Sequence, residues 1–194
     1  MIGVLLGVTS AVKRGSLFDG ISMVIATIGV CVPLFVISVL LLYLFAGVLK
    51  WLPTYGLTTW KYYILPVTCL SFSPIAYIAR MTRSSMLEVM RQDYVTTARA
   101  KGVSKKDVTF RHQLRNSMIP IVTTMGMRLG SMVGSTVLIE SLFVIPGLGS
   151  VMMNGISNRD FMLVANGVLI ISIFVAICNL VVDILYGIID PRTR

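Results

Sequence analysis

The sequence predicts an all-α protein that crosses a membrane several times. Three observations lead to this fold class: the composition is apolar, few residues are charged, and the apolar residues are gathered in long runs. Of the 194 residues, 56% are hydrophobic and 13% are charged, and the mean hydropathy is +0.86. A water-soluble domain of this composition would carry more apolar surface than it could bury. Because every backbone polar group must be paired within lipid, the runs should form helices.

The first twelve residues, MIGVLLGVTSAV, are apolar but too few to cross a membrane. At 1.5 Å per residue, a helix of this size covers little more than about half of a ~30 Å hydrocarbon core. We therefore expect the last part of a partial span whose beginning is missing. No basic residue precedes the segment, so a signal peptide is not predicted. Gly3, Gly7 and Ala11 recur every four residues, a pattern that permits close packing of another helix.

Four complete transmembrane helices are expected next, because four apolar runs approach or exceed the ~20 residues that a spanning helix needs. Their approximate bounds are 21–48, 62–80, 118–140 and 161–187. Pro33, Pro66 and Pro74 lie inside these runs, where proline is tolerated and often kinks the helix.

The distribution of Lys and Arg predicts the orientation. Thirteen of the 17 lie on one side of the membrane in this arrangement, three lie on the other, and Arg128 falls within a span. Basic residues favour the cytoplasmic side, so the segment 81–117 and the C-terminus are predicted to be cytoplasmic. The net charge of +9 is thereby explained by topology, and nucleic acid is not expected as a partner.

The cytoplasmic segment 81–117 is patterned as helix, turn, helix. Asp93 can cap a short helix in which Tyr94, Ala98 and Gly102 recur every four residues. Gly102 suits the end of this helix, and Ser104–Asp107 resembles a capping box that opens a second helix. Phe110, Leu114 and Met118 then follow at i, i+4 and i+8 towards the next span. The small residues of the first helix would let a partner protein approach closely.

This insert resembles the EAA loop of ABC-transporter permease subunits, whose consensus has Glu-Ala-Ala followed by a glycine and, further on, by Ile-x-Leu-Pro. In this sequence the corresponding positions hold Thr96, Thr97, Ala98, Gly102, His112, Leu114 and Arg115. Threonine thus replaces the usual acid, and the proline comes later, at Pro120.

Other stretches extend the resemblance over essentially the whole chain and point to the B-type permease of dipeptide, oligopeptide and nickel importers. These stretches are YIARMTRSSMLEVMRQDY (77–94), ARAKG (98–102), RHQLRNSMIP (111–120), ESLFVIPGLG (140–149), NRD (158–160) and DILYGIIDPR (183–192). The resemblance implies the type I ABC importer permease fold and a single permease domain over residues 1–194. Members usually have six spans, so about the first third is expected to be missing.

The resemblance also implies how such a chain works. In the family, a coupling helix in the EAA loop sits in a cleft on a cytoplasmic ATPase subunit. The coupling helix would here be about 93–104, and the coupling residues would be Tyr94, Thr97, Ala98, Arg99, Ala100, Gly102 and His112. The expected partners are a second permease subunit, two ATPase subunits that bind ATP, an extracellular solute-binding protein and membrane lipid. No cofactor and no catalysis are expected in this chain, because it has no GxxxxGK[ST] phosphate loop.

Two ionisable residues in the run 118–140 are candidates for the transport pathway. Arg128 lies near its middle, and either contacts a peptide carboxylate or donates hydrogen bonds within the protein. Glu140 lies near its outer end, and either binds a substrate amine or reaches the membrane interface. Asp183 is expected to make a local pair or cap. The three cysteines and the single histidine have no ligand spacing, so no metal site is predicted.

Several functions stay open at this stage. The leading prediction is a permease subunit of an ATP-driven importer of di- or oligopeptides in the cell membrane. A nickel or nickel-chelate importer would have the same architecture. A membrane scaffold that docks a cytoplasmic partner without transporting anything is an alternative of another class. A membrane-embedded hydrolase is disfavoured because no nucleophile and base are paired in the sequence.

Overall fold

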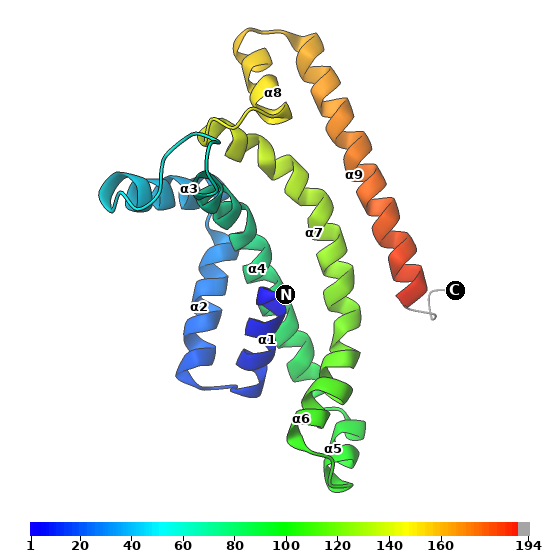
Figure 1. Ribbon diagram of the computed structural model, residues 1–194. Coiled ribbons are helices and arrows are strands. Elements are labelled where there is room, and N and C mark those ends of the chain that lie inside the picture. The colour runs from blue at the N-terminus through cyan, green and yellow to red at the C-terminus, as the bar shows by residue number, and fades with distance from the viewer. Residues whose placement is uncertain (190–194) are drawn as a thin grey trace. The chain divides into compact units, whose positions relative to one another are not determined.

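The computed structural model describes residues 1–189, except for the side chains at 105, 119, 123, 127, 129–131, 183 and 185–189. The described backbone contains helices and no strand, which confirms the all-α prediction (Figure 1). In chain order the helices are α1 (Ile2–Val12), α2 (Leu17–Cys31), α3 (Leu34–Leu42), the π-helical η1 (Tyr43–Val48), α4 (Lys61–Val89), α5 (Asp93–Ala100), α6 (Lys105–Asp107), the π-helical η2 (Val108–Leu114), α7 (Arg115–Leu142), α8 (Leu148–Ser157) and α9 (Phe161–Ile189). The expectations for Asp183 and for the last five residues lie outside what is described.

Within the described residues, two helices are long and apolar enough to cross a membrane by themselves. They are α4 and residues Phe161–Val182 of α9, and they coincide with the predicted runs 62–80 and 161–187. The number becomes three if α2 and the pair α3–η1 together form one broken span. In α7 the described apolar stretch is Met132–Leu142.

The predicted run 21–48 is not one helix, because it breaks at Pro33. Proline has no backbone N–H and restricts the residue before it, so α2 ends at Cys31. The Pro33 carbonyl accepts hydrogen bonds from the N–H groups of Val36 and Ile37, and Pro33 thereby becomes the N-cap of α3. Pro66 and Pro74 behave differently and lie within the continuous helix α4.

The chain forms two compact units, and each is described here by itself. Of the described residues, the first comprises 1–31, 74–126 and 185–189, and the second comprises 32–73 and 127–184. Helices α4, α7 and α9 therefore contribute residues to both units.

In the first unit, α1 packs closely on α4 through its small residues. Gly3, Gly7 and Ala11 are all buried, as their spacing predicts. A Cβ atom at Gly3 would lie 2.7 Å from the Ile75 carbonyl oxygen, and one at Gly7 would lie 2.6 Å from that of Ala79. No larger residue fits at either glycine unless the helices separate.

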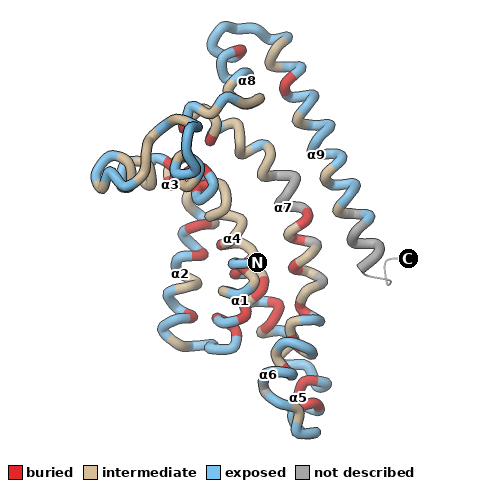
Figure 2. Tube along the Cα trace, viewed as in Figure 1, coloured by how far each residue is buried: buried red, intermediate tan, exposed pale blue. Residues whose placement is uncertain are grey.

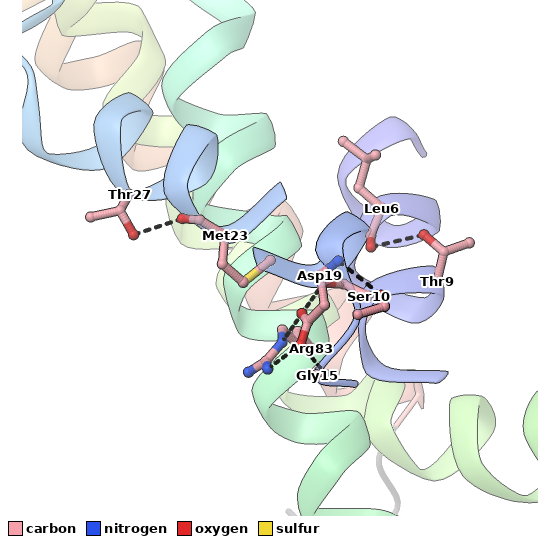
Figure 3. A network of polar contacts seen from close by, with 9 residues as sticks. Leu6, Thr9, Ser10, Gly15, Asp19, Met23, Thr27 and Arg83 are labelled. Carbon is pink, nitrogen blue, oxygen red and sulfur yellow. Dashed lines mark hydrogen bonds and ion pairs between the residues drawn. The ribbon is translucent and has the colours of Figure 1, made fainter. Parts of the chain in front are cut away.

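A partly buried ion pair joins the first turn of α2 to α4 (Figure 3). The carboxylate of Asp19 accepts hydrogen bonds from Nε and Nη2 of Arg83 at 2.6 and 2.8 Å. It also accepts one from the Ser10 hydroxyl at 2.5 Å and one from the Gly15 N–H at 3.0 Å. A buried charge is tolerable only when it is paired and hydrogen-bonded in this way. Arg83 thus has a structural role that its place in the basic segment does not reveal.

The second unit is built around a small apolar cluster. Leu65 and Cys69 of α4 pack against Ile139 of α7 and against Phe143, and residues of α3 and η1 surround them. Most side chains of α9 are exposed (Figure 2). Such a surface suits lipid or other membrane helices better than water.

Candidate functional site

The polar insert begins with α5, which ends at a glycine in the left-handed region. Gly102 has φ +78°. Its N–H donates to the Arg99 carbonyl at 3.0 Å, and the Val103 N–H donates to the Ala98 carbonyl at 3.3 Å. These are the two bonds of a Schellman motif, in which the glycine avoids the strain that a Cβ would bring. The predicted role of Gly102 as a helix end is confirmed.

The second helix of the insert starts at Ser104, also as predicted. The Ser104 hydroxyl accepts a hydrogen bond from the Asp107 N–H at 3.1 Å and donates one to the Asp107 carboxylate at 2.6 Å. The Ser104 carbonyl accepts the Val108 N–H at 2.9 Å. At the start of α5, by contrast, the N-cap is Gln92 and no side chain caps it. The prediction that Asp93 is the cap is therefore wrong, because Asp93 is already the first helical residue.

A small apolar core holds the two arms of the insert together. Val95 and Ala98 of α5 and Val108 of η2 are buried against one another, and Val89 and Val103 pack around them. Figure 2 shows these buried positions of α5 among exposed ones. Val103 and Ala98 are the residues that commonly touch in a Schellman motif, so the turn and the core support each other. The insert is a folded body and not a solvated loop.

The π-helical winding of η2 moves the buried row of side chains by one residue. Val108 and Gln113 are buried at a spacing of five, and the row then continues at the α-helical spacing of four to Ser117 and Ile121. The predicted row at spacing four begins at Phe110, which is 51% exposed. Phe110 therefore lies outside the buried row, because one π turn uses an additional residue.

The predicted coupling residues are distributed over both faces of the insert. Tyr94, Thr97, Arg99, Ala100 and Gly102 are exposed, and His112 is half-buried. Ala98 is only 9% exposed and belongs to the inner core. Its small size serves the packing of α5 on η2, and its neighbours form the surface that a partner could reach.

One link between the arms was missed in the sequence. The side-chain amide of Asn116 donates to the Tyr94 hydroxyl at 3.1 Å and to the His112 carbonyl at 2.8 Å. Asn116, in the first turn of α7, thus connects Tyr94 of α5 with His112 of η2. An exposed asparagine gives no signal of such a role in the sequence.

Glu140, near the end of α7, contacts α8 within the second unit. One of its carboxylate oxygens accepts the Gly149 N–H at 2.7 Å and the Ser150 N–H at 3.3 Å. The first N–H groups of a helix have no partner within the helix, and its N-terminus favours negative charge. A Cβ atom at Gly147 would collide with this carboxylate, and one at Gly149 would collide with the backbone of Val137. The glycines of the GLG sequence therefore allow α8 to approach Glu140.

Arg128 and Glu140 do not form one compact site. They are twelve residues apart on α7, or about 18 Å along the helix axis. Arg128 is half-buried and takes part in an interaction within the chain. A cavity of about 370 Å³ lies beside Glu140 and is lined also by Pro146, Met153 and Asn154.

No group of three or more His, Cys, Asp or Glu residues that could hold a metal ion is found among the described residues. The cysteines are free; Cys31 is exposed, Cys69 is buried and Cys178 is half-buried. The loop around α8, residues 143–160, is called the outer loop because the sequence predicts that it is extracellular. The described residues of the insert and of this loop form packed backbone turns with single charges.

Comparison with known proteins gives a consistent result. A family model described as "Binding-protein-dependent transport system inner membrane component" matches residues 3–194. The chain is 41% identical to the di/tripeptide transport system permease protein DppB of Pseudomonas aeruginosa, over 99% of the chain and 66% of that protein. It is 41% identical to the glutathione transport system permease protein GsiC of Escherichia coli strain K12, and 40% identical to that of Salmonella choleraesuis. Both of these alignments cover 100% of the chain and 63% of the relative. The chain thus spans just under two thirds of the length of these relatives.

Proposed function

Because this chain belongs to the family of binding-protein-dependent transport system inner membrane components, we propose that it is a permease subunit of an ATP-driven importer of short peptides. The names of two relatives support the substrate class, since one refers to di- and tripeptides and the other to glutathione, itself a tripeptide. Nickel is the competing substrate. The chain would lie in the cell membrane with the insert in the cytoplasm, as the distribution of basic residues indicates.

The observation that carries this proposal is the folded insert. An ATPase can change the conformation of a membrane domain only through a contact element that is itself rigid. The insert meets this requirement, because its core of Val95, Ala98 and Val108 and its Schellman turn fix α5 against η2. The exposed side of α5, with Tyr94, Thr97 and Ala100, would be the docking surface.

The mechanism would be a population shift. Two ATPase subunits would close on ATP and open after its hydrolysis, and each state would favour a different arrangement of two permease subunits. An extracellular binding protein would deliver the peptide. This chain would supply the pathway and the docking surface, and the ATPase partners would supply the chemistry.

Arg128 is proposed to line the pathway and to meet the carboxylate of the peptide. Glu140 is proposed to face the outer mouth. Its carboxylate already binds the N-terminus of α8, so an incoming amine would compete with the N–H groups of Gly149 and Ser150. Binding and movement of α8 would then be linked.

A cross-linking experiment tests the docking surface. The three native cysteines are replaced, and a cysteine-reactive photo-crosslinker is attached at Thr97→Cys or, as a control, at Ser157→Cys. Both positions are exposed, but Ser157 lies on α8, on the side predicted to be extracellular. We expect capture of a P-loop ATPase from Thr97→Cys and none from Ser157→Cys in intact cells. Equal capture from both positions, or from neither while solute is imported, overturns the assignment.

A large side chain introduced at Gly102 tests the same docking surface. A Cβ atom there would meet nothing within 4 Å, so a larger side chain would project from the insert. We expect Gly102→Trp to remain membrane-inserted but to lose co-purification of the ATPase. Gly102→Ala is the matched control, because it brings the same left-handed strain without the bulk. Loss of the ATPase from both variants would mean that strain, and not docking, is responsible.

Uptake measurements separate the remaining alternatives. In a strain that lacks the chromosomal copy, the chain and its partners should restore accumulation of a labelled dipeptide and not of nickel. Accumulation of nickel alone would establish the metal importer. An ATPase that cross-links to the insert without accumulation of any solute would favour a non-transporting scaffold.

A further inference from the structure

Gln113 of η2 is buried without a hydrogen-bond partner. Its side chain is 1% exposed, and neither its amide nitrogen nor its amide oxygen is paired. An unpaired amide in the interior is unfavourable, because both atoms lose their bonds to water and gain none in return. A glutamine at this position therefore needs an explanation other than packing.

The explanation is offered by a cavity of about 490 Å³ that Gln113 lines, at the base of the insert. The ends of α1, α4 and α5 and the start of η2 enclose it, and all of them belong to the first unit. Four of the lining residues are apolar, namely Val12, Met90, Val103 and Val108. Besides Gln113, Thr109 contributes a hydroxyl and Arg99 a positive charge. Cavities of about 300–1,000 Å³ with apolar walls and few polar groups are typical sites for small molecules.

The polar groups specify the chemistry of the ligand. The side-chain amide of glutamine has both a donor and an acceptor, so it can bond to either the N–H or the C=O of a peptide group. Arginine binds carboxylates, often through two parallel hydrogen bonds. A ligand that uses both groups and also fills apolar space has an amide, a carboxylate and an apolar side chain.

We propose that this cavity is a binding site for a short peptide with a free C-terminus. The Gln113 amide, both of whose polar atoms are buried, would turn into the cavity and pair with the peptide group. The carboxylate would pair with Arg99, and the side chain would contact the valines. The assignment as a cytosolic product site rests on the proposed function, because only then is the cavity on the receiving side of a peptide importer. A bound peptide would join α5 to η2 and to α1, and accumulated product would thereby act on the proposed docking surface.

Binding to the purified full chain tests the site directly. With the chain in lipid nanodiscs, calorimetry measures binding of alanyl-leucine and of its C-terminal amide. We expect saturable binding of the free acid with a Kd of about 1 mM or tighter, and binding at least about tenfold weaker for the amide. Gln113→Leu and Arg99→Gln should each weaken binding of the free acid by about tenfold or more, whereas Lys101→Gln, which removes an exposed neighbouring charge, should not.

Two results would overturn the proposal. One is the absence of saturable binding by the folded chain. The other is binding that Gln113→Leu leaves unchanged, because such a peptide would occupy the transport pathway instead. Folding is followed by thermal melting, and Gln113→Leu should melt at or above the wild-type temperature, since it removes an unpaired buried amide. Arg99→Gln, at an exposed position, serves as the second variant should Gln113→Leu misfold.

The outcome is separable from that of the proposed function. Cross-linking from Thr97→Cys reports docking of the ATPase and does not depend on Gln113. Failure of peptide binding together with capture of the ATPase would therefore reject the cavity site and leave the permease assignment intact.

Discussion

The insert, which runs from α5 to η2, and the outer loop around α8 are stabilised in different ways. Each reverses the chain between helices and uses a residue in the left-handed region at a helix end. In the insert this residue is Gly102, with φ +78°. In the outer loop the corresponding residues are Val144 and Arg159, with φ +53° and +56°. A left-handed conformation costs a residue with a Cβ atom roughly 1–2 kcal/mol, and a glycine avoids this cost.

The difference lies in what holds each loop. The insert relies on an unstrained turn and on its own apolar core. The outer loop relies on acidic side chains bound to helix N-termini: Glu140 binds α8, and Asp160 accepts the Leu163 N–H of α9 at 3.0 Å. Val144 is also 68% exposed, so packing does little to offset its strain. The comparison shows that apolar packing stabilises one loop, whereas single charge-assisted hydrogen bonds stabilise the other.

The largest effect is expected from Glu140→Ala. It removes a charge-assisted acceptor from two N–H groups of α8, and such a loss costs about 1.5–3 kcal/mol. We expect the free energy of unfolding to fall by this amount and hydrogen exchange at Gly149 to accelerate. Exchange in the insert, at Val108, should stay as in the wild type. Glu140→Gln keeps an acceptor without the charge, so its stability should lie between those of the wild type and of Glu140→Ala. Faster hydrogen exchange in both loops would contradict the comparison, because the stability of the outer loop would then not be independent of that of the insert.

The second-largest effect is expected when a helix cap is removed from either loop. Ser104→Ala removes the cap of the second insert helix, and Asp160→Ala removes the cap of α9. Loss of a side-chain cap costs about 1 kcal/mol in each case. We expect similar losses in thermal stability but different local consequences. Proteolysis of the insert should change little after Ser104→Ala, since the core remains, whereas Asp160→Ala should expose the outer loop to protease. Equal protease sensitivity in both variants would contradict this distinction.

The smallest effect has opposite signs in the two loops. Val144→Gly should stabilise the protein by about 0.5 kcal/mol, because relief of left-handed strain exceeds the entropy that a glycine adds to the unfolded chain. Gly102→Ala should destabilise it by about the same amount for the converse reason. Differential scanning calorimetry of the two variants measures both changes in stability. A loss of stability in Val144→Gly would show that the valine side chain makes contacts that outweigh its strain.

The sequence was informative where a local rule acts alone. Gly102, the capping pair Ser104 and Asp107, and the small residues Gly3 and Gly7 each depend on conformation or size within a few residues. Their predicted roles are confirmed by the left-handed turn, by the hydrogen bonds and by the close approach of α1 to α4.

Other features depend on neighbours that are distant in the chain or on a choice between similar local states. Asp19 is one acid in an apolar stretch, and only the folded unit shows that Arg83 neutralises it. The capping of α8 by Glu140 requires a turn of the chain that periodicity does not describe. A proline inside a helix can either kink it or end it. The helix ends before Pro33, whereas α4 continues through Pro66 and Pro74. The winding of η2 departs from the spacing of four that Phe110, Leu114 and Met118 indicate, because π-helical turns are rare and the sequence pattern describes only the common α-helical turn.

The additional residue of η2 sets the angular position of the whole insert. Deletion of one residue between Val108 and Leu114 would allow ordinary α-helical winding, and the surface of α5 would swing by about 100° around the axis that α7 continues. Length alone at this point, with no change in side-chain chemistry, therefore decides in which direction the exposed side of α5 points.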